Sequence, residues 1–147
     1  MSAVQVAEYL AGHTRIIVVT NGPGGMPHPV PMNYGIDDAG RVVITSFAAS
    51  QKVRNLERDP KASLLVESGA TYHELKAVIL YCDAELVRDP DEIAHGMRVI
   101  RADVGLAESL TSAMSAQVRA SLAKRVLVRF TAFRTVSWDH ARLGEAY

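Results

Sequence analysis

The chain has 147 residues, of which 48% are hydrophobic and 22% charged, and this composition is typical of a soluble globular protein. Its length suits a single domain over residues 1–147, because two domains would each have a small core. Sixteen basic residues balance sixteen acidic ones, so the overall charge favours neither a nucleic acid nor an anionic membrane as partner.

Cysteine and histidine content excludes several kinds of site. Cys82 is the single cysteine, so an intrachain disulfide is impossible and thiolates are too few for a zinc or iron–sulfur centre. The five histidines show no metal-binding spacing, and we expect no metal. No uncharged apolar run reaches about 18 residues and no export signal is evident, which predicts a cytoplasmic protein that does not span a membrane.

The first elements are a short helix and a strand. Ser2 and Gln5 have the spacing of a capping box, which predicts a helix that ends near Gly12. The β-branched run from Arg15 to Thr20 predicts a strand, because the glycine-rich segment 21–25 that follows it is typical of a turn.

The next two segments predict a hairpin. His28 to Ile36 forms one strand in this interpretation, a turn follows at 37–40, and Arg41 to Ser46 forms the strand that pairs with it. Proline has no amide for a central ladder, so we expect the first of these strands at a sheet edge or a bulge; the prolines are Pro27, Pro29 and Pro31.

Helical and extended patterns alternate in the rest of the chain. A short helix is predicted from Ser50 to Leu56, ended by Asp59-Pro60, and strands are predicted from Lys61 to Glu67 and from Leu75 to Val87. One or two amphipathic helices fill 90–123, with apolar residues at Ile93, Met97, Ile100, Leu106, Leu110, Met114, Val118 and Leu122. A final strand from Arg125 to Trp138 places on one face Val126, Val128, Phe130, Ala132 and Val136.

This order of elements predicts a mainly β fold with α insertions. Hairpins interrupted by short helices favour an antiparallel β-barrel with peripheral helices, in which closure removes most exposed edges. A doubly wound parallel fold would need more alternation of strands and helices.

The segment from Thr45 to Lys52 is the best candidate for chemistry. A strand end leads there through small residues into a helix start, so the hydroxyls of Thr45, Ser46 and Ser50, the first helical amides and the Lys52 ammonium could converge on a phosphate. The alternative from spacing alone is an ordinary helix cap followed by a solvated basic face.

Two further positions are candidates for contact with a flat ring. Pro31, Met32 and Asn33 could border such a ring from the edge strand, or the prolines could serve only to block aggregation. Trp138 could cover a ring, anchor a subunit interface or fill a core. Since the sequence shows no nucleophile motif or acid–base pair, a cofactor would supply the reactive atom if the protein is an enzyme.

Four segments resemble one known family. The segments Pro27 to Asn33, 45–67, 71–90 and Ser137 to Leu143 are similar to the pyridoxamine 5′-phosphate oxidase-like superfamily of split barrels, in particular its flavin/deazaflavin (F420-dependent) oxidoreductases. The resemblance implies a homodimer with two cofactor sites at its interface. Gln51 stands where many relatives carry Arg or Lys, which leaves Lys52 as the principal cation.

The resemblance also implies roles for single residues. Ser50, Gln51 and Lys52 would bind the cofactor phosphate, Thr45 and Ser46 would lie along the ribityl chain or phosphate, and Pro31 to Asn33 would lie near the ring, with Trp138 approaching the site of the partner chain. We expect an oxidoreductase that transfers hydride from coenzyme F420 to a small planar acceptor. The alternatives are an FMN-dependent oxidase or reductase and a non-catalytic flavin- or haem-binding module.

Overall fold

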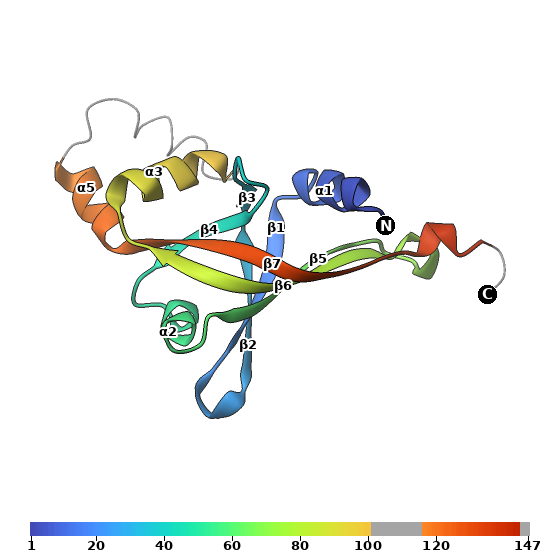
Figure 1. Cartoon of the computed structure of the whole chain (residues 1–147), viewed down its shortest axis with the longest axis horizontal. Helices are drawn as coiled ribbons and strands as arrows, with labels where there is room; N and C mark the ends of the chain where they lie inside the picture. The colour runs from blue at the N-terminus through green and yellow to red at the C-terminus, as the bar shows by residue number, and fades with distance from the viewer. Residues whose placement is uncertain (101–115, 145–147) are drawn as a thin grey trace.

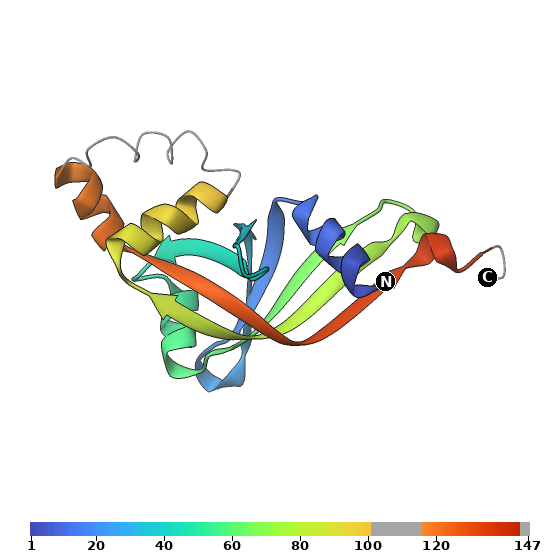
Figure 2. The ribbon, with the colours of Figure 1, turned by 45° about the horizontal axis from the view of Figure 1, so that its top comes forward.

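The structure, a computed structural model, describes residues 1–100 and 116–144 (Figure 1). Within these residues seven strands form an antiparallel sheet in the order β2-β1-β5-β6-β7-β4-β3. The sheet curls into the predicted split barrel with helices outside it (Figures 1 and 2). The strands are β1 (Arg15–Asn21), β2 (Pro27–Asn33), β3 (Gly35–Ile36), β4 (Val42–Phe47), β5 (Lys61–Ser68), β6 (Lys76–Val87) and β7 (Arg125–Asp139). The helices are α1 (Ala3–Ala11), α2 (Gln51–Arg58), α3 (Pro90–Val99) and α5 (Ala116–Ala123), with short 3-10 turns at Pro23–Gly25, Tyr72–Glu74 and His140–Arg142.

The proline-rich strand β2 lies at a sheet edge, as its sequence predicts. Pro27, Pro29 and Pro31 occupy alternate positions opposite Asn21, Val19 and Ile17 of β1. The amides that the prolines lack therefore belong to the side of β2 that faces away from β1, and the ladder between the two strands is intact. The same prolines prevent another strand from adding to this edge.

The predicted pairing of residues 28–36 with 42–46 is wrong for most of that segment. The chain leaves β2 at Tyr34, whose side chain is buried in the core, and only β3 pairs with β4. The turn at Gly22–Met26 instead joins β1 and β2 as a hairpin, since Gly24 and Gly25 adopt the positive φ angles that other residues avoid. Pro31, Met32 and Asn33 thus lie beside β1 and not beside β4.

A bulge in β7 changes which of its residues face the core. Tyr81 pairs with Arg134 but Cys82 pairs with Ala132, so Phe133 is an extra residue. Before the bulge, Val126, Val128 and Phe130 point into the barrel core, as predicted. After it the alternation is inverted and Val136 faces outward beside Ile79, so the prediction that it shares a face with Val126 is wrong.

The first two helices begin and end where local signals place them. Ser2 caps α1 through the predicted capping box with Gln5. Helix α2 ends at Arg58, before Asp59-Pro60, because a residue that precedes proline disfavours the helical region. Its residues Val53 and Leu56 are buried in the barrel core.

The later helices form a second small core outside the barrel. Ile93 and Met97 of α3 pack with Leu122, Val43 and Leu127, so this helical stripe faces the sheet. The predicted apolar positions Leu106, Leu110 and Met114 lie outside the described residues, and so does the side chain of Val118. Among the described helices we find none that is both long and apolar enough to cross a membrane.

Candidate functional site

A polar corner forms where β4 leads into α2. The Ser46 and Ser50 hydroxyl oxygens lie 3.0 Å apart, and Lys52 Nζ donates a 2.8 Å hydrogen bond to Ser46 Oγ. Ser50 occupies the helix cap position, but its side chain makes no capping bond, which corrects the predicted cap. Its hydroxyl is instead engaged with Ser46. The structure thus brings together three of the residues predicted from sequence.

Lys52 contributes an ammonium group to this corner. Its side chain is half-buried, and burial holds the pKa of the ammonium below the usual value of 10.5. None of the carboxylates in the described part of the chain forms an ion pair with it. An ammonium that is partly desolvated and lacks a counter-ion is stabilised by an anion.

The donors at this corner suit a phosphate. The first helical amides, those of Gln51, Lys52 and Val53, have no acceptor within α2, and the positive end of the helix dipole lies at the same place. Together with the Ser46 and Ser50 hydroxyls and the Lys52 ammonium, they would hold a cofactor through its phosphate group.

Thr45 and Gln51 do not share this corner through their side chains. Thr45 alternates with Ser46 along β4 and lies on the face of Val43, which belongs to the second core. The Gln51 amide nitrogen donates a 2.7 Å hydrogen bond to Asn55 Oδ1 and so lies along the helix.

A polar clamp fixes α2 against the end of β1. Asn55 is fully buried, and its Nδ2 donates a 3.0 Å hydrogen bond to Thr20 Oγ1. Arg58 donates to the Asn21 carbonyl oxygen, and Asn21 Nδ2 donates a 2.8 Å bond to Asp59. The position of Lys52 relative to β4 therefore depends on contacts of α2 with β1. A buried Asn within a short amphipathic helix is the sequence signal for this clamp, which our sequence reasoning missed.

The predicted ring-contact residues lie on the two faces of β2. Met32 packs partly buried against the barrel core, whereas Pro31 is exposed and Asn33 is half-exposed on the outer face of the sheet. Pro31 and Asn33 are thus the residues of this segment that could border a ring outside the barrel.

Trp138 is far from the corner of its own chain. Ser46 pairs with Val126, and Trp138 lies a dozen residues farther along β7, about 40 Å at 3.3 Å per residue. Trp138 is 37% exposed and lies on the outer face opposite Ala77. The predicted site residues therefore form one site only if a second chain contributes.

Metal chemistry and thiol chemistry have no support in the part of the chain that the structure describes. No group of three or more His, Cys, Asp or Glu side chains gathers there in a way that could hold a metal ion. Cys82 is fully buried, and burial, with a smaller effect of Asp83, raises the pKa of its thiol to about 12. It is therefore not a nucleophile at neutral pH.

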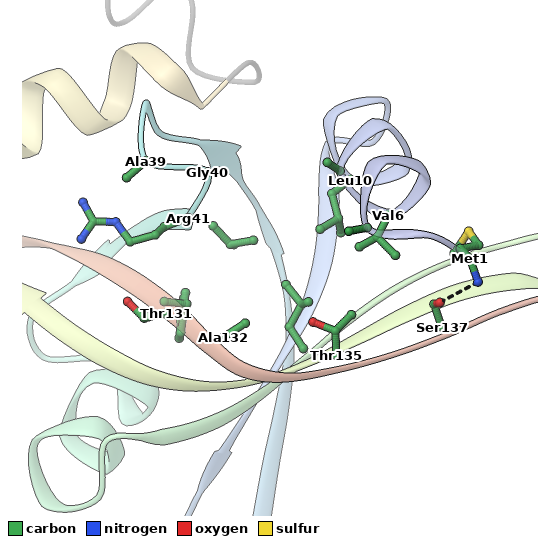
Figure 3. Close-up of a pocket in the computed structure, with 15 residues that line it drawn as sticks. Met1, Val6, Leu10, Ala39, Gly40, Arg41, Thr131, Ala132, Thr135 and Ser137 are labelled. Atoms are coloured by element: carbon green, nitrogen blue, oxygen red, sulfur yellow. Dashed lines mark hydrogen bonds between the residues drawn. The ribbon is translucent and has the colours of Figure 1, made fainter.

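A separate cavity of about 560 Å³ lies between α1, the turn before β4, and β7 (Figure 3). Its lining is mainly apolar, with Val6 and Leu10 on one side and Ala132 and Thr135 on the other. Arg41 also lines it, but its guanidinium is held by Asp37 at 2.9 Å. The cavity contains none of the residues predicted to bind the cofactor, and its second cation is the Met1 ammonium, which donates a 3.2 Å hydrogen bond to Ser137 Oγ.

Comparisons with known proteins agree with this fold. The sequence matches the family described as Pyridoxamine 5′-phosphate oxidase over residues 3–139. Among solved structures, the conserved hypothetical protein Rv2991 from Mycobacterium tuberculosis is 34% identical, and the match covers 100% of this chain and 90% of that protein with a TM-score of 0.82. We found no similar sequence among the curated proteins.

More distant structures share the fold alone. A FAD-binding protein from Mesorhizobium loti is 15% identical, with 93% of this chain and 94% of that chain covered and a TM-score of 0.68. An F420 reductase is 18% identical, with 84% and 89% covered and a TM-score of 0.59.

Proposed function

This chain belongs to the pyridoxamine 5′-phosphate oxidase family, and from that premise we propose that it is an oxidoreductase that uses the deazaflavin coenzyme F420. The observation that carries the proposal is the corner of Ser46, Ser50 and Lys52, where hydroxyls and an ammonium converge as a phosphate requires. When bound, reduced F420 would supply hydride for a small planar organic acceptor such as an enone or a quinone. The protein then supplies position, electrostatics and exclusion of water.

Each candidate residue has a part in holding the cofactor. Lys52, Ser46 and Ser50 bind the phosphate, and Gln51 contributes its backbone amide, because its side chain is engaged with Asn55. Thr45 contributes through its backbone, because its side chain lies on the face of β4 that carries Val43. Pro31 and Asn33 border the ring on the outer face of the sheet, and Met32 supports them from the core side.

The outer face of the sheet carries an apolar row. Ile17 pairs with Leu65, Leu65 with Ile79, and Ile79 with Val136, so four strands place apolar side chains next to one another. Pro31 of β2 extends the row beyond Ile17. Since the opposite face of these strands already packs into the barrel core, this row is a second apolar surface of the sheet, of the kind that marks an interaction site.

We propose that a second copy of the chain covers this face. Pro31 and Asn33 lie at one end of it and Val136 and Trp138 at the other, four strand spacings or about 19 Å apart. A twofold axis parallel to the strands exchanges these ends and places Trp138 of the partner subunit over Pro31 and Asn33. Such a homodimer would complete two equivalent sites.

FMN is the alternative cofactor, because it also carries a phosphate and the family is described as an oxidase, pyridoxamine 5′-phosphate oxidase. The experiment is titration of the purified protein with F420 and with FMN, followed by absorbance and fluorescence. We expect F420 to bind with a Kd below about 100 µM, which corresponds to about −5.5 kcal/mol. If the protein binds neither F420 nor FMN, the proposal is contradicted. If it binds FMN more tightly than F420, the FMN alternative is selected. If it binds a cofactor but turns over no acceptor, it is a non-catalytic module, and haem is titrated in parallel to test for that case.

The dimer has its own test. Light scattering should give about 32 kDa, twice the 16.0 kDa of one chain. Trp138→Ala should weaken the dimer or the cofactor affinity, whereas Tyr72→Ala, which removes another exposed aromatic side chain, should change neither. A monomer at micromolar concentration that binds cofactor with full affinity contradicts the interface.

Because Cys82 is a free thiol, we place the protein in the reducing cytoplasm.

A further inference from the structure

The cavity beneath α1 follows from the residues that β7 places there. Leu80 and Val78 of β6 point into the barrel core, and the residues opposite them on β7 are Thr135 and Ser137. Opposite residues of a strand pair point to the same side, so after the bulge β7 presents two short polar side chains where it earlier presents Phe130. They do not fill the space under the helix, and a cavity of about 560 Å³ remains.

Helix α1 forms the opposite wall of this cavity. One face of the helix lines it, at residues that recur with helical spacing: Ala3, Val6, Ala7 and Leu10. The remaining wall is mainly apolar, and Figure 3 shows the helix above it and β7 below. Mainly apolar cavities of roughly 300 to 1,000 Å³ with a few polar groups are typical of sites for small organic molecules.

Two hydroxyl groups of β7 are the polar groups in the middle of the cavity. Thr131 and Thr135 both line it, and neither hydroxyl has a hydrogen-bond partner within residues 1–100 and 116–144 (Figure 3). A hydroxyl donates one hydrogen bond, and a carbonyl oxygen accepts one. A ligand with a carbonyl oxygen would therefore bind here more tightly than a hydrocarbon of the same shape.

Charged groups line only the two ends of the cavity in the described part of the chain (Figure 3). Arg41 lies at one end, where Asp37 at 2.9 Å compensates its charge. The Met1 ammonium lies at the other end and donates to Ser137. The described residues between these ends are uncharged. A carboxylate there would lose water without gaining a counter-ion, so the cavity favours a neutral molecule.

We propose that this cavity is a binding site for a neutral aromatic or alicyclic ketone. Its hydrocarbon body lies between α1 and β7, and its carbonyl oxygen accepts a hydrogen bond from the Thr135 hydroxyl. The site shares no residue with the corner of Ser46, Ser50 and Lys52 or with the outer apolar row. It therefore depends neither on the cofactor nor on the dimer proposed above.

Three related naphthalenes test the class of ligand. N-phenyl-1-naphthylamine is a neutral dye that fluoresces in apolar sites, and displacement of this dye measures their affinities. We expect 2-acetonaphthone, the ketone, to displace it with a Kd below about 100 µM. The hydrocarbon 2-ethylnaphthalene should bind about 5- to 10-fold more weakly, and the carboxylate 2-naphthoate more weakly by at least about 10-fold. No displacement by the ketone, or a naphthoate that binds as tightly as the ketone, overturns the proposal.

Substitution of Thr135 tests the contact with the carbonyl oxygen. Thr135→Val removes the hydroxyl and keeps the shape of the side chain, so it should weaken the binding of 2-acetonaphthone about 5- to 10-fold and leave that of 2-ethylnaphthalene unchanged. Thr135→Ser keeps the hydroxyl and should keep the preference for the ketone. An unchanged preference for the ketone in Thr135→Val contradicts the proposed contact.

A larger residue on α1 tests the place of binding. Ala7→Leu fills part of the cavity with a residue of similar helix propensity, and it should weaken the binding of the dye and of the ketone by at least about 10-fold. Val4→Leu is the control, because Val4 is 67% exposed on the same helix and does not line the cavity. Wild-type affinity of a folded Ala7→Leu protein would place the ligand elsewhere and overturn the proposal. If Ala7→Leu does not fold, the response of Thr135→Val decides.

Discussion

Lys52 Nζ donates a 2.8 Å hydrogen bond to Ser46 Oγ, and this bond joins the first turn of α2 to the end of β4. The ammonium has only neutral hydroxyls around it, so an anion would gain more from this position than the hydroxyls do. We predict that Lys52→Ala weakens cofactor binding by about 1.5 to 3 kcal/mol, the range for hydrogen bonds to charged groups. Titration calorimetry measures the change.

The matched control for this prediction is Lys124→Ala, which removes the same charge from an exposed position in the turn before β7. It should leave cofactor affinity within about 0.5 kcal/mol of the wild type, as for most surface substitutions. Equal affinities of Lys52→Ala and the wild type would remove Lys52 from the site.

The lowered pKa of Lys52 predicts a pH dependence of binding. A bound phosphate favours the ammonium, so the pKa in the complex is higher than in the free protein, and binding takes up a proton between the two values. Affinity should therefore fall as the pH rises through the pKa of the free protein, at a pH below 10.5. Lys52→Arg stays charged and should lose this decline; the same decline in both proteins would assign it to the cofactor.

The stability of the free protein should change in the opposite direction. Because the folded state disfavours the Lys52 ammonium, its energetic cost is fully present below the folded pKa. The cost is relieved as the pH rises from that value toward 10.5, where the unfolded chain binds more protons than the folded one.

The clamp between α2 and β1 predicts that Asn55→Ala destabilises the fold. The substitution leaves the buried Thr20 hydroxyl without its donor and the Gln51 amide without its acceptor, at a cost of about 1 to 3 kcal/mol. Urea unfolding measures this loss of stability, and the same measurement on Thr20→Val gives the cost of removing the other partner of the bond. Since both variants break one bond, the double variant should lose less than the sum of the two; strict additivity would show that the bond contributes nothing.

Local signals explain why many boundaries could be predicted from the sequence. The capping box of Ser2 and Gln5, the Asp59-Pro60 stop and the β-branched runs each act through neighbouring residues, and α1, α2, β1, β5 and β6 lie within a residue or two of their predicted bounds. Ser46, Ser50 and Lys52 came together for the same reason, because a single turn brings them within reach of one another.

Relations that depend on strand order could not be predicted in this way. The pairing of Pro31 with Ile17 follows from a core position for Tyr34, and the outward direction of Val136 follows from the bulge at Phe133. Neither feature has a marker in its own segment. The distance between Trp138 and the corner becomes evident only once Ser46 is known to pair with Val126.

Cys82 should be inert in the folded protein. Burial raises the pKa of its thiol to about 12, with a further contribution from Asp83, so almost no thiolate exists at pH 8. A disulfide reagent such as Ellman's should react slowly with native protein and at the rate of an ordinary thiol in urea. Fast reaction of the native protein at pH 8 would mean that β6 opens readily at this point.

The contact between β3 and α3 predicts a large effect of Gly35→Ala. A Cβ atom on Gly35 would lie 2.2 Å from the Val99 carbonyl oxygen and 2.6 Å from the carbonyl carbon, closer than real Cβ atoms come. These are backbone atoms, so no rotamer change relieves the clash, and the end of α3 must move away from the sheet. We expect a loss of about 1 to 3 kcal/mol, as for other overpacked sites, measured by urea unfolding.

Gly12→Ala is the control for that substitution, because the conformational entropy of the unfolded chain changes in the same way. A Cβ on Gly12 would lie 3.4 Å from the nearest atom, Glu8 O, and Gly12 has a right-handed helical conformation that alanine adopts freely. Gly12→Ala should therefore be neutral or stabilising by up to about 1 kcal/mol. If both variants behave alike, α3 does not pack against β3 as closely as these distances require. The packing of α3 against β4 would then also be less close than the structure shows.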